Sequence, residues 1–246
     1  MLFLERCGWF KAAGKGLAFL RVALASGLLA LALSIVAPTG ALASVDPRQD
    51  TGSWRRLDYV TWPGVREIRS RDVQMLVKWS DVLDRFAHEG GRTEAKCAAP
   101  ASGRCIGGRE WTNLLASLRD KDRLTQMREI NRFVNQAAYR SDDENYGRVD
   151  YWATPTELFS RGGDCEDFAL TKFFALRELG LDNRDIRLVV LQALDIGIPH
   201  AVLMVRVAGE TYILDNRTGE IVTAESALRY RPIYSVNEEY WWLHLS

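Results

Sequence analysis

The sequence predicts one α+β domain in which helices come first and a predominantly antiparallel sheet follows. Three observations lead to this prediction. Apolar residues recur at helical spacing through much of residues 71–139. Residues 164–179 are apolar on most sides, which indicates a deeply buried helix. Three runs rich in β-branched and aliphatic residues follow between residues 186 and 215, and they predict neighbouring strands.

The first 43 residues have the three-part plan of a secretory signal peptide. Basic residues precede the mostly apolar run VALASGLLALALSIV at 22–36, and small residues before Ser44 offer an A-x-A cleavage site. An uncleaved membrane anchor is the alternative, because this run is short for a membrane span but not too short to form one. We expect cleavage, which leaves residues 44–246 as the folded domain.

Charge and cysteine content narrow the class of protein. The chain has 32 basic and 32 acidic residues, so it lacks the polybasic signature of a nucleic-acid binder. Beyond the leader lie three cysteines, Cys97, Cys105 and Cys165, and an odd number in an exported chain leaves one thiol outside any disulfide. Cys97 and Cys105 bracket an irregular loop, and we expect an oxidising compartment to join them. Two buried thiols are the alternative.

The helical part of the chain is expected in several pieces. Residues 44–70 look like a loosely structured lead-in, and helical spacing begins at residues 71–87. It returns at residues 110–119 and at 121–139, where one apolar stripe marks the core face of an amphipathic helix. The polar run RSDDENYGRVD at 140–150 could hold a cation, but solvated acids are the simpler interpretation.

Cys165 begins the buried helix, within the segment RGGDCEDFAL at 161–170. Acidic neighbours oppose ionisation of a thiol. The two glycines permit a sharp entry, and Asp164 suits the N-cap, which places Cys165 in the first helical turn. There the unpaired N–H groups and the helix dipole favour a thiolate, and the same groups could stabilise an oxyanion. The alternative is a capped helix with an inert buried cysteine.

A thiol nucleophile needs a base, and the base needs an orienting group. His200 opens the second strand-like run, and Asp215 ends the third. If a two-residue turn at 208–209 joins these strands, the two side chains share a face, one diagonal step apart. His88, beside a glycine-rich loop, and His244, near the end of the sequence, are weaker candidates for the base. A histidine at the start of a strand is, taken singly, more often structural than catalytic.

Three segments together carry a family resemblance, namely RGGDCEDFALTKFFALRELG, HAVLMVRV and YILDNRTGEI. They resemble the bacterial transglutaminase-like cysteine proteinases, and among these the LapG-type periplasmic adhesin proteases. The resemblance covers about residues 70–235, and its most specific element is the D-C-E-D block. It implies a papain-like core in which a cysteine-bearing helix packs on an antiparallel sheet. It also implies that Cys165 is the nucleophile, His200 the base and Asp215 the orienting residue.

The same resemblance implies a cofactor. LapG-type enzymes are similar in being calcium-dependent, with the acids that flank the cysteine as ligands, which here are Asp164 and Glu166. Carboxylates suit a hard cation that takes oxygen ligands, and bound Ca²⁺ would offset the negative charge around Cys165. Further ligands must come from elsewhere in the chain. A capping pair of Asp164 and Asp167 is the alternative interpretation of these acids, and it is compatible with either outcome.

The function implied is that of a periplasmic, calcium-dependent cysteine endopeptidase. It would cleave the N-terminal region of a large outer-membrane-held adhesin, release it and promote biofilm dispersal. The implied partners are that adhesin and an inner-membrane cyclic di-GMP receptor that sequesters the protease; no nucleic acid is expected. Two alternatives stay open: a transglutaminase or amidase with the same triad, and a non-catalytic secreted binding module.

The two cysteines of the irregular loop give a first prediction. Because they flank a loop in a chain expected to enter an oxidising compartment, Cys97 and Cys105 should be bonded to each other in periplasmic protein. Mass spectrometry of a non-reduced digest should find their peptides linked, with the Cys165 peptide separate. Recovery of both loop thiols in reduced form would contradict this prediction.

Overall fold

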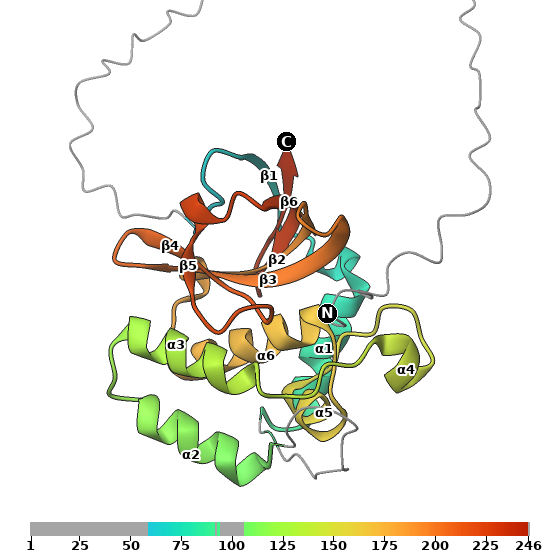
Figure 1. Ribbon diagram of the computed structural model, residues 1–246. Helices are drawn as coiled ribbons and strands as arrows, with labels where there is room; N and C mark the ends of the chain where they lie inside the picture. The colour runs from blue at the N-terminus through green and yellow to red at the C-terminus, as the bar shows by residue number, and fades with distance from the viewer. Residues whose placement is uncertain (1–58, 92, 94–105, 246) are drawn as a thin grey trace, which may run out of the picture. The chain divides into compact units, whose positions relative to one another are not determined.

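The computed structural model describes residues 59–91, 93 and 106–245. Within this part of the chain the fold is α+β, as the sequence predicts, with a layer of helices against one face of an antiparallel sheet (Figure 1). None of the helices described is long and apolar enough to span a membrane.

One sheet contains every strand named here, and its strands are β1 (Arg66–Ser70), β2 (Ile186–Ala193), β3 (Ile198–Val207), β4 (Glu210–Leu214), β5 (Val222–Thr223), β6 (Tyr230–Val236) and β7 (Trp241–Leu245). Their order across the sheet is β1-β7-β6-β2-β3-β4-β5. Alternate residues of β2 and β3 face opposite sides, so one set joins the helix-side core and the other a smaller apolar cluster. A slip of one residue would exchange the two sets, which makes this register specific.

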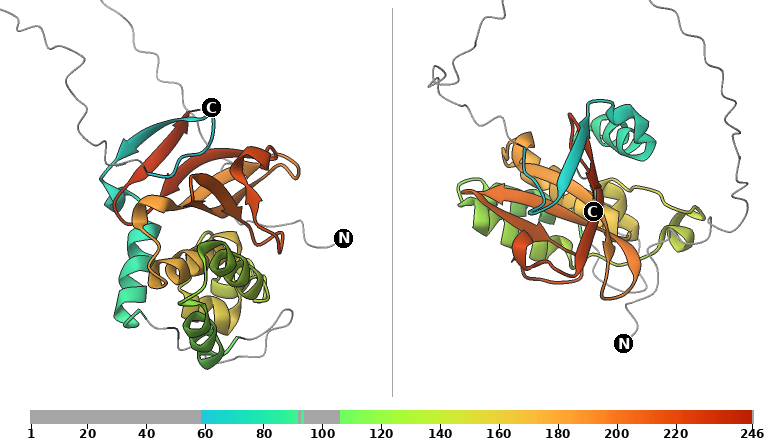
Figure 2. Two further views of the ribbon diagram at one scale, coloured as in Figure 1. Left: turned by 90° about the vertical axis from the view of Figure 1, so that its left-hand side faces the viewer. Right: turned by 90° about the horizontal axis from the view of Figure 1, so that it is seen from above.

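The helical layer consists of α1 (Val77–His88), α2 (Gly108–Leu118), α3 (Arg123–Val134), α4 (Asp142–Tyr146), α5 (Pro155–Arg161) and α6 (Cys165–Glu178), with short 3-10 turns η1 (Val73–Met75), η2 (Asn183–Asp185) and η3 (Ala224–Ser226). α6 packs on β2 and β3 and is flanked by α3 and α5 (Figure 2). The helices therefore enclose α6 on the sides that the sheet leaves open.

α6 is the buried helix that the sequence predicts. Every residue from Cys165 to Leu176 is buried, because apolar side chains surround the helix axis. The helix ends where Gly180 adopts a left-handed conformation with φ of 81°, and the N–H of Leu181 donates to the carbonyl of Leu176 at 2.9 Å.

The β3–β4 hairpin has the two-residue turn that the sequence predicts. Ala208 and Gly209 both have positive φ, 53° and 89°, which is typical of the turn that matches the twist of paired strands. Val207 pairs with Glu210 across it. The two strands therefore run side by side in the register that the expected pairing of His200 with Asp215 requires.

Three sequence expectations change. The lead-in expected at 44–70 is wrong at its C-terminal end, because residues 66–70 form β1 and pair with β7. The segment REIRS has only one aliphatic side chain, Ile68, so it gives no alternating signal. The helix expected over 121–139 ends at Val134, and the polar run at 140–150 contains α4.

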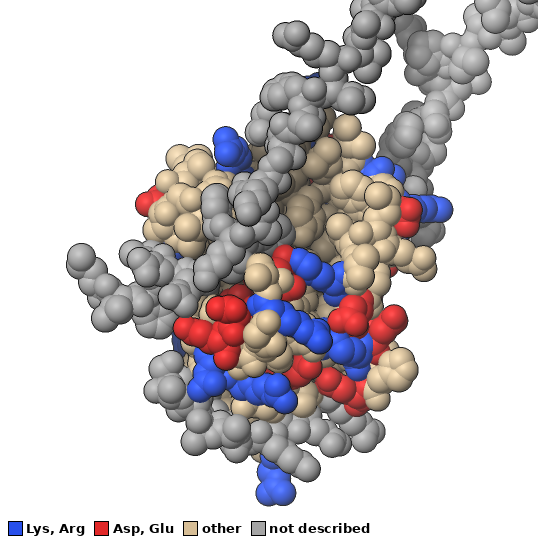
Figure 3. Space-filling view, turned by 90° about the vertical axis from the view of Figure 1, so that its right-hand side faces the viewer, with Lys and Arg blue, Asp and Glu red and all other residues tan. Residues whose placement is uncertain are grey.

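Other expectations cannot be compared with this fold. The signal peptide at 1–43 and the Cys97–Cys105 disulfide lie outside the described residues. The surface that is described agrees with the balanced charge of the sequence. Figure 3 shows Lys and Arg interspersed with Asp and Glu over the helical part of one face, and mostly uncharged atoms over the sheet. This face carries no broad field of one sign.

Candidate active site

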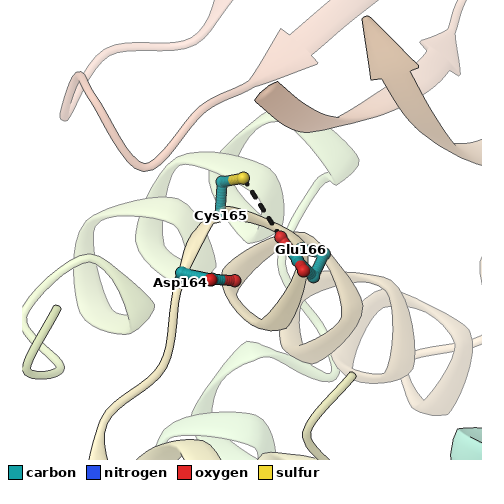
Figure 4. Close-up of side chains that lie close together, drawn as sticks. All are labelled: Asp164, Cys165 and Glu166. Carbon is teal, nitrogen blue, oxygen red and sulfur yellow. Dashed lines mark hydrogen bonds between the residues drawn. The ribbon is translucent and has the colours of Figure 1, made fainter. Parts of the chain in front are cut away.

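Cys165 lies where α6 meets β3. It is the first residue of the helix, and its side chain packs against Ala201, the residue after His200. The thiol is buried, with 2% of the residue exposed, and Sγ donates to Oε2 of Glu166 at 3.1 Å (Figure 4). Contact between α6 and β3 thus places Cys165 against the residue that follows His200 in the sequence.

His200 and Asp215 face each other across the hairpin. The Nε2 atom of His200 is joined to Oδ1 of Asp215 by a hydrogen bond of 2.8 Å, and both side chains are buried. Since Nε2 is directed at the carboxylate, Nδ1 is the ring atom that can exchange a proton with a thiol. The structure therefore brings together the histidine and the acid that the sequence analysis paired.

Asp215 is held as an anion by several donors. Burial alone would raise its pKa, but the hydrogen bond and charge of His200, the hydroxyl of Tyr230 and the backbone N–H of Arg217 at 2.9 Å together lower the pKa below its usual range. The guanidinium of Arg229 lies 3.6 Å from Oδ2. An ionised carboxylate in this position orients the imidazole and stabilises its protonated form.

The loop that carries Asp215 is held by hydrogen bonds from α3 and from Asn135, the residue that caps the end of this helix. Asn135 donates from Nδ2 to the carbonyls of Asp215 at 2.9 Å and Thr218 at 2.8 Å, and Asn131 donates to the carbonyls of Thr218 and Gly219, both at 3.1 Å. Tyr230, Asn131 and Asn135 are supporting residues that sequence reasoning missed. A polar position on a helix or strand gives no signal of which distant carbonyl it meets.

α6 also buries a lysine close enough to Asp215 to feel its charge. Lys172 is fully buried, and burial lowers its pKa to about 7, although the charge of Asp215 acts in the opposite direction. The sequence predicts this helix as apolar, and a single lysine within it does not indicate that its ammonium group lies near Asp215.

The glycine pair before Cys165 is required by close contacts. Gly162 has φ of 87°, and a Cβ there would lie 2.6 Å from the carbonyl oxygen of Ala138. A Cβ on Gly163 would lie 2.2 Å from Oδ2 of Asp167. No L-residue with a side chain fits either position without displacing its neighbour, as the sequence analysis expects of a sharp entry into the helix.

Asp167 fastens this entry to the rest of the fold. Its Oδ2 accepts from the backbone N–H of Asp164 at 3.0 Å, and its Oδ1 accepts from that of Ala153 at 2.6 Å. The expected capping pair of Asp164 and Asp167 is thus present, and its short hydrogen bond is the one that Asp167 accepts. Both carboxylate oxygens of Asp164 are buried.

Four carboxylates form what we call the acidic cluster: Asp142, Asp150, Asp164 and Glu166. Oxygens of Asp142, Asp150 and Glu166 lie within 4.8 Å of one another, and Asp142 also comes within this distance of Asp164 and Asp167. Burial, followed by the charges of Glu166 and Asp167, raises the pKa of Asp164 well above its usual value. Oxygen atoms gathered in this way suit a hard divalent cation.

Two members of this cluster were missed by sequence reasoning. The expectation that the acids at 140–150 are solvated is wrong for Asp142, which lies at the start of α4 and is 1% exposed. Asp150 has a left-handed backbone with φ of 71°, an uncommon conformation for a residue with a side chain. The sequence signal for these two ligands is the number of acidic residues in the run at 140–150, which is typical of a segment that binds a cation.

The other histidines lie elsewhere. His88 is exposed at the end of α1, where Nδ1 contacts the carbonyl of Asp84 at 2.6 Å. His244 is buried in β7, where Nε2 contacts Oγ of Ser235 at 3.0 Å, and burial lowers its pKa to about 4. Neither residue is at the junction of α6 and β3, whereas His200 precedes Ala201, which packs against Cys165.

Comparisons with known proteins agree with this arrangement. The family model described as bacterial transglutaminase-like cysteine proteinase matches residues 101–246. A calcium-bound structure of LapG from Legionella pneumophila is 34% identical over 55% of this chain and 77% of that chain, with a TM-score of 0.51. An EGTA-treated structure of LapG is 34% identical over 56% and 76%, with a TM-score of 0.52. A search of curated protein sequences found no match. The core is therefore transglutaminase-like.

The glycine contacts give a prediction. Gly163→Ala should lower the free energy of unfolding by about 1–3 kcal/mol, because the new methyl group displaces Asp167 from two backbone N–H groups. Gly219→Ala is the control, since a Cβ there meets nothing within 4 Å. It should change stability by less than about 0.5 kcal/mol. Urea denaturation of both variants measures the difference, and equal effects would contradict the structural account.

Proposed function

The chain belongs to the bacterial transglutaminase-like cysteine proteinases, and we propose that it is a calcium-dependent endopeptidase of the LapG type with Cys165, His200 and Asp215 as its catalytic triad. The observation that carries this proposal is the 2.8 Å hydrogen bond between His200 and Asp215, beside the helix that begins with Cys165. A nucleophile, a base and an orienting acid are the groups that acyl transfer requires.

The geometry suggests how each residue acts. Nδ1 of His200 takes the thiol proton, and the sulfur of Cys165 attacks the carbonyl carbon of the scissile peptide bond. Backbone N–H groups in the first turn of α6 would stabilise the oxyanion that forms. His200 then protonates the leaving amine, and water hydrolyses the thioester. Asp215 keeps the imidazole oriented and stabilises its charged form throughout.

Calcium fits the residues present. Both carboxylate oxygens of Asp164 and Oε1 of Glu166 are buried and accept no hydrogen bond from the described residues. We propose Asp164 and Glu166 as ligands, with Asp142 and Asp150 as further oxygen donors. The LapG structures in calcium-bound and EGTA-treated forms support this choice of ion. Bound Ca²⁺ would supply positive charge that offsets Glu166, whose carboxylate next to Sγ otherwise opposes the thiolate.

The biological setting is proposed from family membership. Removal of residues 1–43 would leave a periplasmic domain of residues 44–246. Its substrate would be the N-terminal region of a large outer-membrane-held adhesin, and cleavage would release the adhesin and promote biofilm dispersal. An inner-membrane cyclic di-GMP receptor would sequester the protease.

The triad predicts a graded loss of activity. Cys165→Ala and His200→Ala should each abolish cleavage of an adhesin N-terminal fragment without unfolding the chain. Asp215→Asn should reduce turnover by about 10²- to 10⁴-fold, since the orienting group is neither nucleophile nor base. His88→Ala is the matched control and should cleave at the wild-type rate.

Two outcomes would argue against this assignment. Near-normal cleavage by His200→Ala would require another base. Incorporation of a primary amine in preference to hydrolysis, measured with the same fragment, would favour a transglutaminase over a protease.

The acidic cluster predicts dependence on calcium. EGTA should stop cleavage reversibly, and Ca²⁺ should restore it better than Mg²⁺, which holds its water more tightly and demands stricter geometry. Calcium at about 100 times its Kd should stabilise the fold by about 2.7 kcal/mol, seen as a higher Tm. Asp164→Ala, Glu166→Ala and Asp142→Asn should each weaken this shift. The control is Asp143→Asn, because Asp143 is exposed beside Asp142.

A wild-type chain that binds no calcium in calorimetry would refute the metal site. Activity that persists in EGTA would do the same. Neither result would by itself affect the triad.

A further inference from the structure

A lysine from a distant helix reaches the acidic cluster. Lys78, near the start of α1, forms an ion pair with Asp150. Burial lowers the pKa of Lys78, and the charges of Glu166, Asp142 and Asp164 act against that decrease, so this ammonium lies in the field of the whole cluster. Together with Asp150, these three carboxylates are the residues that we propose as calcium ligands.

The position of Lys78 is fixed by the packing of α1. Trp79, the next residue, is fully buried and meets Trp152 edge to face, with ring centroids 6.4 Å apart. Trp152 donates from Nε1 to Oδ1 of Asp150 at 3.0 Å. Two turns along α1, Arg85 donates to the carbonyl of Trp152 at 2.5 Å. The helix is therefore anchored at two points on Trp152, which in turn holds Asp150, the residue that Lys78 contacts.

A counter-charge favours the ionised form of the carboxylates in the acidic cluster. Several buried carboxylates in one place repel one another, and a buried charge is costly unless it is paired. An ammonium ion on Asp150 occupies an oxygen that a metal ion would need. Repulsion between a single and a double positive charge at such short range disfavours the presence of both.

We propose that Lys78 is a tethered counter-ion that offsets part of the negative charge of the acidic cluster in the absence of calcium, is displaced when calcium binds and thereby sets the calcium affinity of the site. This inference rests on the calcium site proposed above. Displacement is feasible because 43% of the Lys78 side chain is exposed and its four-carbon stem is flexible. The cluster would thus have a positive partner in both states.

The test uses the full exported chain and Ca²⁺ alone as the ligand. Lys78→Met removes the charge but keeps most of the stem, Lys78→Gln is a second neutral variant, and Lys78→Arg keeps the charge. Lys121→Met is the matched control, because it removes one positive charge from an exposed position. Calcium affinity is measured by calorimetry, and Tm is measured in EGTA and in saturating calcium.

We expect Lys78→Met and Lys78→Gln to bind Ca²⁺ about tenfold more tightly than the wild type, from the loss of one repelling charge. Their Tm should fall in EGTA and recover in saturating calcium. Lys78→Arg and Lys121→Met should match the wild type in affinity. A lysine with a purely structural role would instead lower Tm equally in EGTA and in saturating calcium when it is replaced.

Three outcomes would overturn the inference. The first is a Kd of both neutral variants within twofold of the wild-type value. The second is an equal fall of Tm in EGTA and in calcium, which would make Lys78 a packing residue. In both cases the wild type still binds calcium, so the proposed metal site stands. The third is a wild type that binds no calcium, which removes the metal site and the role of Lys78 together.

Discussion

Compensation of buried negative charge at the start of α6 is the constraint on which this structure depends. Cys165 is flanked by acids that are almost completely buried, and each finds a different solution. Asp167 accepts hydrogen bonds from two backbone N–H groups and so holds the segment that leads into α6. Asp164 and Glu166 keep oxygens without hydrogen-bond donors among the described residues, and so are suited to a cation. The acids beside the thiol therefore serve to position it, provided that positive charge is supplied.

The second half of the site is built on an independent element. The hairpin of β3 and β4 holds His200 against Asp215 through a turn of only two residues, and Tyr230 from β6 adds a third contact. The packing of α6 on β3 then places Cys165 against Ala201, the residue after His200. The pairing of His200 with Asp215 is thus local in sequence, whereas the position of Cys165 depends on tertiary packing. A disturbance of α6 can move Cys165 without breaking the hairpin.

This division explains which features the sequence could predict. His200 and Asp215 could be paired because turn chemistry and two-residue periodicity set their shared face. The helix at Cys165 could be predicted from glycines, an N-cap and apolar residues. Asp142 and Asp150 could not be placed, because their burial depends on contacts with α6 that no local pattern records. β1 was missed because its single aliphatic residue, Ile68, gives no period, and it forms only by pairing with β7.

That pairing has a consequence for the order of assembly. β1 is synthesised before the other strands, and its partner β7 is the last strand of the described chain, so β1 waits through most of translation for its hydrogen bonds. The buried ion pair of Glu67 and Arg187, at 2.8 Å, joins β1 to β2, which also lies far along the chain. Contacts that close such long loops form slowly, because the chain entropy is lost before they stabilise the fold. The β1 edge of the sheet is therefore the part that closes last, after the hairpins of β2, β3 and β4 have their own partners.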